Sequence, residues 1–398
     1  MANRPGFYKN GISKDIRTET DSSPITGSQT LTTITASAPF FSAADVGRVV
    51  KFSSGQRATI TAFTSTTIVS ASPSQTVGST TFLLWGNTLG GDIGEAIVCN
   101  SNNIIVGLEQ SINNADEHVF YLNTGTNVIR DLGFEAASTF VPYDLSEDGF
   151  VLLDSDPGFT GHRAKLYDPN LQSFTDLGLL PLGTQTTPAA MNASHVCAVT
   201  CEVNNPPIQE KATRWSGGVL TSVHPVADAG TEDSIAQFIN SSGQIAGLFT
   251  DATSFVLRVF FNPSGGEGNS VDIGALQVDG EVDAADMNNS GVIVGTAELG
   301  PDFVPFQWST GPGMTAIPLL PATTDGEATS INNNGWIVGT MSNIPFVYHD
   351  GVTHKLLDLI TLAPEWTQLF TAQFINDNNQ VVGTGLRSGV FKFYILSL

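Results

Sequence analysis

Three carboxylates recur at one position of a repeated sequence motif. Glu95, Asp283 and Glu327 each stand five residues before the anchor residue of an Asn-centred repeat. Equivalent positions of a repeat occupy equivalent places in a fold, so these side chains could gather near a common axis. Clustered carboxylates perform glycoside hydrolysis or bind calcium. We favour the simpler interpretation, in which they are acidic residues at strand starts of an acidic protein, and the hydrolase alternative stays open.

Other catalytic motifs are absent from the sequence. It contains no His-Glu-x-x-His, no phosphate-binding Gly-x-x-x-x-Gly-Lys and no Gly-x-Ser-x-Gly. We expect the histidines, scattered over different strands and loops, to be surface or blade-edge residues rather than catalytic bases. They are His118, His162, His195, His224, His349 and His354. The prediction is a protein that is not an enzyme, with no catalytic residue and no cofactor.

Two loops present clustered oxygen atoms that could attract calcium. They are Asn376-Asp377-Asn378-Asn379 and Ser146-Glu147-Asp148-Gly149. Neither has the spacing of an EF-hand loop, which ends in a bidentate Glu at position twelve. Asx-rich hairpin turns explain both loops more simply, so we predict no metal site.

The cysteines also predict no metal. Cys197 and Cys201 would lie on one strand roughly 13 Å apart, too far for a disulfide. We expect these two and Cys99 to be buried, inert thiols.

The Asn-centred motif occurs seven times. Its clearest copies are Ile331–Gly339, Met287–Gly295 and Ile239–Gly247, and two degenerate copies end in Leu153 and Val199 instead of Gly. The anchor residues lie 44 to 48 residues apart, a period typical of β-propeller blades. They are Asn100, Ser146, Asn192, Asn240, Asn288, Asn332 and Asn376.

Each repeat predicts four strands, because apolar alternation and turn residues recur in the same order. In the sixth repeat these are 328–332, 336–341, 345–349 and 354–359. Asn and Gly between the first two strands accept the positive φ of a tight hairpin.

Other positions of the repeat also keep their character. Small residues four before each anchor suit the innermost strand of a propeller. We expect the third-strand aromatics to fill the layer between neighbouring blades: Tyr121, Tyr167, Trp215, Phe261, Trp308, Tyr348 and Phe393. A fourth-strand Asp-Leu-Gly or near equivalent follows, as in Asp131–Gly133, Asp176–Gly178 and Asp272–Gly274.

The predicted fold is all-β, with three parts. Residues 1–28 form an extended N-terminal arm, residues 29–80 form a small β-rich module, and residues 81–398 form a seven-bladed β-propeller. The last repeat has too little chain for its fourth strand. We therefore expect residues 81–87 to pair with the C-terminal strand and to close the ring.

Charge is uneven along the chain. The net charge is −22, with about +3 in residues 1–90 and about −25 in the rest. So acidic a body argues against direct nucleic-acid binding by the propeller. The first twenty residues lack the apolar core of a signal peptide, and no segment reaches the roughly 20 apolar residues of a membrane helix. Synthesis in a host cytoplasm and no membrane segment are expected.

Two resemblances give this architecture a setting. The run Asp45-Val46-Gly47-Arg48, then Ala58–Phe63 and Thr66–Val69, resembles a small β module of tail and other virion proteins of tailed bacteriophages. The repeats, with Ile-Asn-Asn-x-Gly-x-Ile-Val-Gly, the aromatic third strand and Asp-Leu-Gly, resemble HAF-type repeats of bacterial extracellular proteins. The second and third repeats depart from that pattern.

The resemblances imply a structural component of the virion, most simply a tail protein such as a nozzle, adaptor or fibre-anchoring subunit. Its expected partners are other tail proteins and further copies of itself, with a host surface receptor as a further possibility. The N-terminal arm and module would attach it through Arg4, Lys9, Lys14, Arg17 and Arg48. The alternative is a receptor- or glycan-binding adhesin of the tail tip. Its candidate loop aromatics are few, namely Phe134, Phe159 and Trp366.

Overall fold

A computed structural model supplies the fold. It describes residues 21–37, 41, 46, 49–52, 56–85, 93–110, 117–125, 128–133, 138–157, 161–204, 208–225, 233–251, 254–263, 265–360 and 366–398. The protein is all-β: the described residues form antiparallel sheets of three or four strands, without an α-helix. The chain divides into two compact units, Met1–Asp176 and Leu177–Leu398.

The N-terminal module is a four-stranded sheet in the order β1-β4-β2-β3, with β3 also paired to β4. Its strands are β1 (Asp21–Ala36), β2 (Val49–Phe52), β3 (Arg57–Ser65) and β4 (Ile68–Trp85). Alternate apolar residues from all four strands, including Ile34, Phe52, Ile60 and Val69, form a fully buried core. β1 begins before, and β4 ends after, the limits 29–80 expected for the module.

These two long strands change the expected domain limits. Residues 21–28, expected in the arm, belong to β1 and pair with the end of β4, for example Ser22 with Leu83. Residues 81–85, expected to pair with the last strand of the chain, end β4 instead and pair with β1 and β2. β1 and β4 extend each other, because the backbone hydrogen bonds between them satisfy donors and acceptors that would otherwise be unpaired. These hydrogen bonds offset the small apolar content of residues 21–28.

Two repeat sheets follow within the first unit, each four-stranded and in sequential order. The first contains β5 (Ile93–Cys99), β6 (Ile104–Gln110), β7 (Glu117–Asn123) and β8 (Val128–Gly133). The second contains β9 (Ser138–Leu145), β10 (Val151–Pro157), β11 (Arg163–Asp168) and β12 (Ser173–Asp176).

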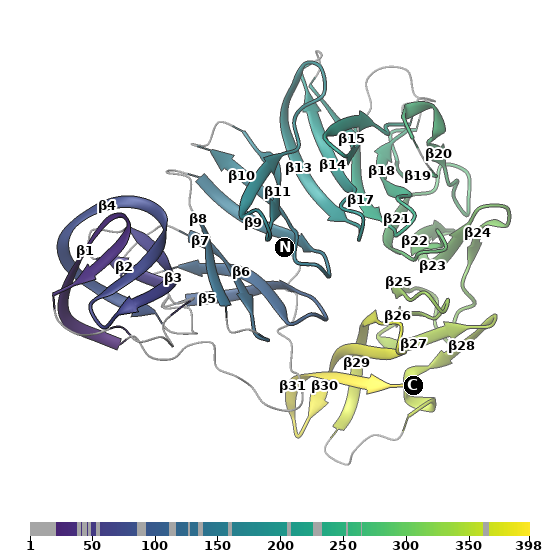
Figure 1. Ribbon diagram of the computed structural model, residues 1–398. Coiled ribbons are helices and arrows are strands. Elements are labelled where there is room, and N and C mark those ends of the chain that lie inside the picture. Colours follow the sequence, from purple (N-terminus) through teal and green to yellow (C-terminus); the bar gives the residue numbers. More distant parts are fainter. Residues whose placement is uncertain are drawn as a thin grey trace. The chain divides into compact units, whose positions relative to one another are not determined.

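The second unit contains the remaining repeat sheets, which Figure 1 shows from β13 to β31. The third repeat sheet contains β13 (Gly183–Met191), β14 (Cys197–Val203), β15 (Gln209–Ser216) and β16 (Val219–Ser222). The fourth contains β17 (Ser234–Ile239), β18 (Ile245–Thr250), β19 (Leu257–Asn262) and β20 (Val271–Asp272). The fifth contains β21 (Val282–Met287), β22 (Ile293–Leu299), β23 (Asp302–Ser309) and β24 (Gly313–Ala316). The sixth contains β25 (Glu327–Ile331), β26 (Ile337–Met341), β27 (Ile344–His349) and β28 (Val352–Lys355). The seventh has three strands, β29 (Trp366–Ile375), β30 (Gln380–Arg387) and β31 (Val390–Ser397).

The strand predictions for the sixth repeat are confirmed within two residues for β25, β26 and β27. The fourth strand is shorter and lies earlier than predicted. A 3-10 turn, η3 (Leu356–Asp358), replaces its second half, because Leu356 turns inward and is fully buried. A second 3-10 turn, η2 (Glu267–Asn269), precedes β20.

The third-strand aromatics pack as predicted in six repeats, with exposed fractions of 9 % or less. Rings of successive repeats touch: the centroids of Tyr121 and Tyr167 are 6.0 Å apart, and those of Phe261 and Trp308 are 5.0 Å apart. In these two pairs the aromatic side chains help to join one repeat sheet to the next.

Phe393 in the seventh repeat sheet is the exception, with 55 % of its surface exposed. One face of this sheet packs against the sixth repeat through Leu369, Ala372 and Tyr394. In the described part of Leu177–Leu398 no sheet follows on the other face, which carries four exposed apolar side chains. These are Phe374, Phe391, Phe393 and Ile395.

Candidate functional site: the anchor turns

Each anchor residue organises the turn between the first two strands of its repeat. In the fourth repeat, Oδ1 of Asn240 accepts hydrogen bonds from the backbone nitrogens of Ser242 and Gln244, at 3.1 and 3.0 Å. The backbone of Asn240 also donates to the carbonyl of Gln244 and accepts from Gly243. The same pair of side-chain bonds recurs at Asn100, Asn192, Asn288, Asn332 and Asn376. The predicted hairpin turns are therefore confirmed, and the Asn side chain is the group that closes them.

The amide nitrogen of the anchor makes a second kind of bond, which links one repeat to the next. In five of the six Asn anchors, Nδ2 donates to the backbone carbonyl of the following anchor, at distances from 2.7 to 3.2 Å. The series runs from Asn192 through Asn240, Asn288 and Asn332 to Asn376 in the second unit, and from Asn100 to Ser146 in the first. We call this series the anchor ladder. Asn suits both bonds because its short side chain carries an acceptor oxygen for its own turn and a donor nitrogen for the neighbouring repeat.

Among the described residues, two anchors make no such bond to a following anchor of their own unit. The hydroxyl of Ser146 accepts from the Phe150 nitrogen at 2.9 Å and donates to Asp148 at 2.5 Å. Serine thus closes the turn, but it has no amide to offer a neighbouring repeat. Asn376, in the last repeat, donates within its own turn to the side chain of Gln380 at 2.9 Å.

The fourth residue of every anchor turn has a positive φ. Gly occupies it in four repeats, with φ from 74° to 93°, and Asn103 and Asn379 occupy it in two more. In the third repeat His195 takes the same conformation, at φ 57°. Gly and Asn adopt this region at little cost, whereas His adopts it with strain.

The Gly that closes the motif has a different purpose. A Cβ atom on Gly295 would lie 2.0 Å from the carbonyl oxygen of Asp283 on the neighbouring strand, and Gly247 and Gly339 face the same obstacle. These glycines pair with Ala across the hairpin. In the two degenerate repeats the cross-strand pairs are Pro142 with Leu153 and Pro188 with Val199, so the two positions vary together.

Asp286, two residues before the anchor Asn288, makes a second set of hydrogen bonds between repeats. Oδ2 of Asp286 accepts from the hydroxyl of Ser330 at 2.8 Å and from the nitrogen of Ile331 at 2.9 Å, both in the next repeat. Burial raises the pKa of the Asp286 carboxyl, although these hydrogen bonds oppose the rise. Ser330 in turn accepts from the nitrogen of Ile375 at 3.4 Å. Three successive inner strands are thus cross-linked by short polar side chains.

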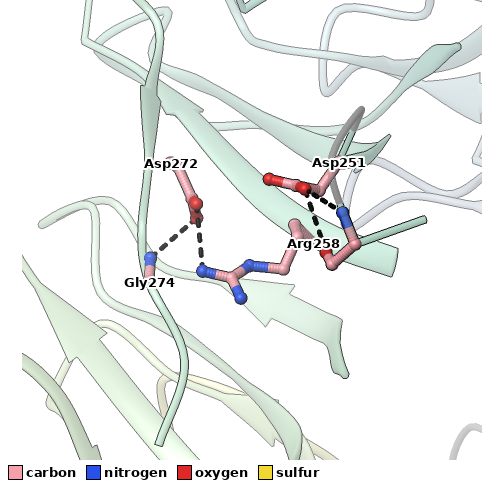
Figure 2. Close-up of polar contacts among 5 residues, drawn as sticks. Asp251, Arg258, Asp272 and Gly274 are labelled. Atoms are coloured by element: carbon pink, nitrogen blue, oxygen red, sulfur yellow. Dashed lines mark hydrogen bonds and ion pairs between the residues drawn. The ribbon is translucent and has the colours of Figure 1, made fainter. Parts of the chain in front are cut away.

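The Asp of the fourth-strand motif also acts locally. Figure 2 shows the carboxylate of Asp272 between the nitrogen of Gly274, at 2.8 Å, and the guanidinium of Arg258, at 3.0 Å. Asp251 lies on the opposite side of Arg258, and its carboxylate accepts hydrogen bonds from the backbone nitrogen and the hydroxyl of Ser254. Asp272 therefore closes the turn after its strand and ties it to β19.

A hollow of about 350 Å³ lies between the first two repeat sheets, beside the second anchor turn. Ile104, Tyr121 and Pro169 form its apolar wall. The polar groups around it come from four elements and are Asn123, Arg130, Asp148 and Asn170.

The predicted attachment residues Arg4, Lys9, Lys14, Arg17 and Arg48 lie outside the described residues. Of the three equivalent carboxylates, Asp283 and Glu327 are exposed at the starts of β21 and β25, and the side chain of Glu95 is outside the description. Neighbouring protein atoms shield part of the Asp283 carboxyl from water, and this raises its pKa. The described residues contain no group of three or more His, Cys, Asp or Glu side chains that could hold a metal ion.

Cys197 and Cys201 are fully buried thiols, as expected, but Cys99 is exposed. Two histidines form contacts that sequence spacing did not reveal: Nδ1 of His162 lies 2.6 Å from the buried carboxylate of Asp154, and Nδ1 of His224 lies 2.7 Å from the hydroxyl of Ser234. His224 is buried, so the expectation of a surface or blade-edge residue is wrong for it. Trp366, proposed as an exposed loop aromatic, is instead the first residue of β29 and packs, partly buried, against the core of the last repeats.

No protein-family model matches the chain, and no curated protein matches it in sequence. Among solved structures, a prolyl endopeptidase is similar to 76 % of this chain, with a TM-score of 0.51 and 10 % identity. The chain spans about half of that enzyme, 50 % of its length, and the similarity concerns the fold alone. The β-propeller domain of the trilobed protease from Pyrococcus furiosus is matched over 99 % of its length and 85 % of this chain, with a TM-score of 0.43 and 8 % identity. TolB from Acinetobacter baumannii is matched over 63 % of its length, with a TM-score of 0.36 and 11 % identity.

The part of the chain that the structure describes holds no helix with the length and apolar character needed to cross a membrane.

Proposed function

We propose that this protein is a non-enzymatic structural component of a bacteriophage virion, most simply a tail protein attached through its N-terminal arm and module. The observation that carries the proposal is the anchor ladder. Its Asn side chains are fully engaged in closing turns and in joining repeats, so the most regular feature of the sequence serves a rigid architecture. The resemblance of the N-terminal module to virion proteins supplies the setting.

We further propose that the seven repeats are the blades of one β-propeller. Seven motifs at 44 to 48 residues, each with its own small antiparallel sheet, support this arrangement. In a closed ring every sheet has a neighbour on both faces. The exposed apolar face of the seventh repeat sheet, with Phe374, Phe391, Phe393 and Ile395, supports a ring because it would otherwise remain in water.

Particle composition tests the proposal. Phage particles from a lysate that produces this protein would be purified by density gradient, and peptide mass spectrometry would measure its amount relative to the major capsid protein. We expect a fixed, sub-stoichiometric ratio that persists through repeated gradients. Recovery of all of the protein in the soluble fraction would overturn the virion role.

Attachment through the arm is tested separately. In a variant with Arg4, Lys9, Lys14 and Arg17 changed to Ser, we expect particles that lack the protein, because the positive charges of the arm are gone. A matched variant with the exposed Lys392 and Arg387 changed to Ser should still be incorporated. Equal incorporation of both variants would contradict attachment by the arm.

A further inference from the structure

The last strand of the chain forms an unusually long edge of its sheet. In the described part of the chain the seventh repeat sheet has the order β29-β30-β31, so β31 pairs with β30 on one side only. β31 has eight residues and follows β30 without a bulge. The outer strands of the other sheets in the second unit, β16, β20, β24 and β28, have only two to four residues. Proteins commonly keep edge strands short, because a long edge pairs with other chains.

The other repeats show which backbone groups of the third strand point outward. In the fifth sheet the nitrogen of Ile317, just after the outer strand, donates to the carbonyl of Pro305 at 2.8 Å. Pro305 immediately precedes Phe306, the residue that pairs with the closing Gly295 of the motif. The residue at the position of Pro305 therefore directs its backbone groups to the outer strand.

Phe393 occupies this position in the seventh repeat, since the next residue, Tyr394, pairs with the closing Gly383. Backbone groups alternate along an antiparallel strand, so the N–H and C=O groups of Phe391, Phe393 and Ile395 all point to the open edge. The side chains of the same three residues are exposed, with fractions of 72 %, 55 % and 52 %. The edge thus offers backbone hydrogen bonds and apolar side chains together.

We propose that a second copy of the chain pairs with this edge, β31 against β31, antiparallel and about a two-fold axis. With the axis at Phe393, this residue lies opposite its own counterpart, and Phe391 lies opposite Ile395 of the second copy. The contact therefore places three apolar pairs on one face of a continuous sheet. On the other face Lys392, the one charged residue of β31, lies opposite Tyr394 of the second copy.

Other registers of self-pairing fit less well. An axis at Lys392 places two ammonium groups directly opposite each other, which destabilises a strand pair. An axis at Tyr394 places Phe391 opposite Ser397 of the second copy and keeps only two of the apolar pairs. The sequence of β31 is thus self-complementary about Phe393, and this selects a second copy as the occupant of the edge.

This contact goes beyond the proposed virion role, because it assigns the chain a two-fold contact with itself through one named strand. It uses the edge of the seventh sheet rather than its open face, so it does not depend on closure of the ring. The tests use isolated full-length protein. Their failure would therefore leave the virion role untouched.

Sedimentation velocity over a series of protein concentrations tests the pairing. We expect a monomer–dimer equilibrium in the wild type. Phe393→Pro should raise the Kd of the dimer about tenfold or more, which corresponds to about 1.4 kcal/mol, because proline has no N–H for the central pair. This variant should fold, since Pro305 and Pro345 occupy the equivalent position in the fifth and sixth sheets.

Phe374→Thr is the matched control for the edge. It changes an exposed apolar side chain on the same face of the sheet but on β29, away from the edge, and should leave the Kd unchanged. Monomers at every concentration, or a dimer that Phe393→Pro leaves as tight as the wild type, would overturn the proposal.

Disulfide cross-linking tests the register in a Cys99→Ser background, which lacks the exposed native thiol. Phe393→Cys should form an intermolecular disulfide, because the Cα atoms of the two residues at the axis would lie about 5.5 Å apart. Phe391→Cys should form none, since its counterpart would lie four residues further along the strand, about 13 Å away. Cross-linking of Phe391→Cys, or its absence in Phe393→Cys, would overturn the proposed pairing.

Discussion

The side-chain amide of Asn288 donates to the backbone carbonyl of Asn332, 44 residues later, at 3.1 Å. The same side chain accepts from Ser290 and Val292 within its own turn. One residue therefore closes a hairpin and fixes the distance to the next repeat. Both jobs explain why Asn returns at this position through most of the chain.

Replacement of Asn288 by Ser should separate these two jobs. Ser146 shows that a serine hydroxyl can close the turn, so Asn288→Ser keeps an acceptor and loses the bond to Asn332. We expect a loss of about 1 kcal/mol in the free energy of unfolding, measured by urea titration. Asn376→Ser is the control, because the Asn376 amide bonds within its own turn to Gln380. An equal loss in both variants would show that the ladder bond adds nothing.

Gly295 should not tolerate a methyl group. The added Cβ of Gly295→Ala would lie 2.0 Å from the Asp283 carbonyl oxygen, so the hairpin must open. We expect a loss of about 3 kcal/mol, or insoluble protein. Gly268→Ala is the control, since a Cβ there meets nothing within 4 Å. A melting temperature for Gly295→Ala equal to that of the control would contradict the crowding.

Asp286 should make stability depend on pH. Its folded-state pKa is raised by burial, so the folded protein binds the proton more readily than the unfolded chain. This contribution is present below the ordinary pKa of Asp and is lost as pH rises through the folded pKa. The wild type should therefore gain stability relative to Asp286→Asn when pH is lowered. Paired denaturant titrations across the acid range would measure the difference, and the opposite slope would refute this assignment.

His195 is a site for stabilisation. It occupies the positive-φ position of the third anchor turn, where other repeats have Gly or Asn. Replacement by Asn should raise the free energy of unfolding by about 0.5 kcal/mol, because Asn adopts this conformation with less strain. The reverse change, Asn103→His, should lower it by a similar amount. Calorimetry on both variants checks the sign, and a destabilised His195→Asn would mean that the His side chain contributes more than the strain costs.

The repeat pattern predicted the strands and turns well, because hairpin chemistry is local. Asn and Gly at adjacent positions mark the turns, and the aromatic third strand marks a buried layer. The sequence did not predict the hydrogen bonds between repeats. Nothing in the spacing of Asn288 and Asn332 indicates that one donates to the carbonyl of the other, or that Asp286 reaches Ser330.

The sequence also misplaced residues 81–85, and for a physical reason. Trp85 has the right distance from the first anchor to belong to a repeat. However, the continuous run from Ile68 to Trp85 finds a complete partner in β1, and this pairing depends on residues far away in sequence. The hollow beside Arg130 was missed likewise, because its walls come from separate strands and turns of two repeats.

Cryo-electron microscopy of purified particles, with the repeat domain located in the density, tests the central claim most directly. The account predicts ordered copies at a fixed place on the tail, each a ring of seven small sheets joined at the anchor turns. Particles whose fully assigned density contains no such ring, while the protein remains free in the lysate, would contradict it.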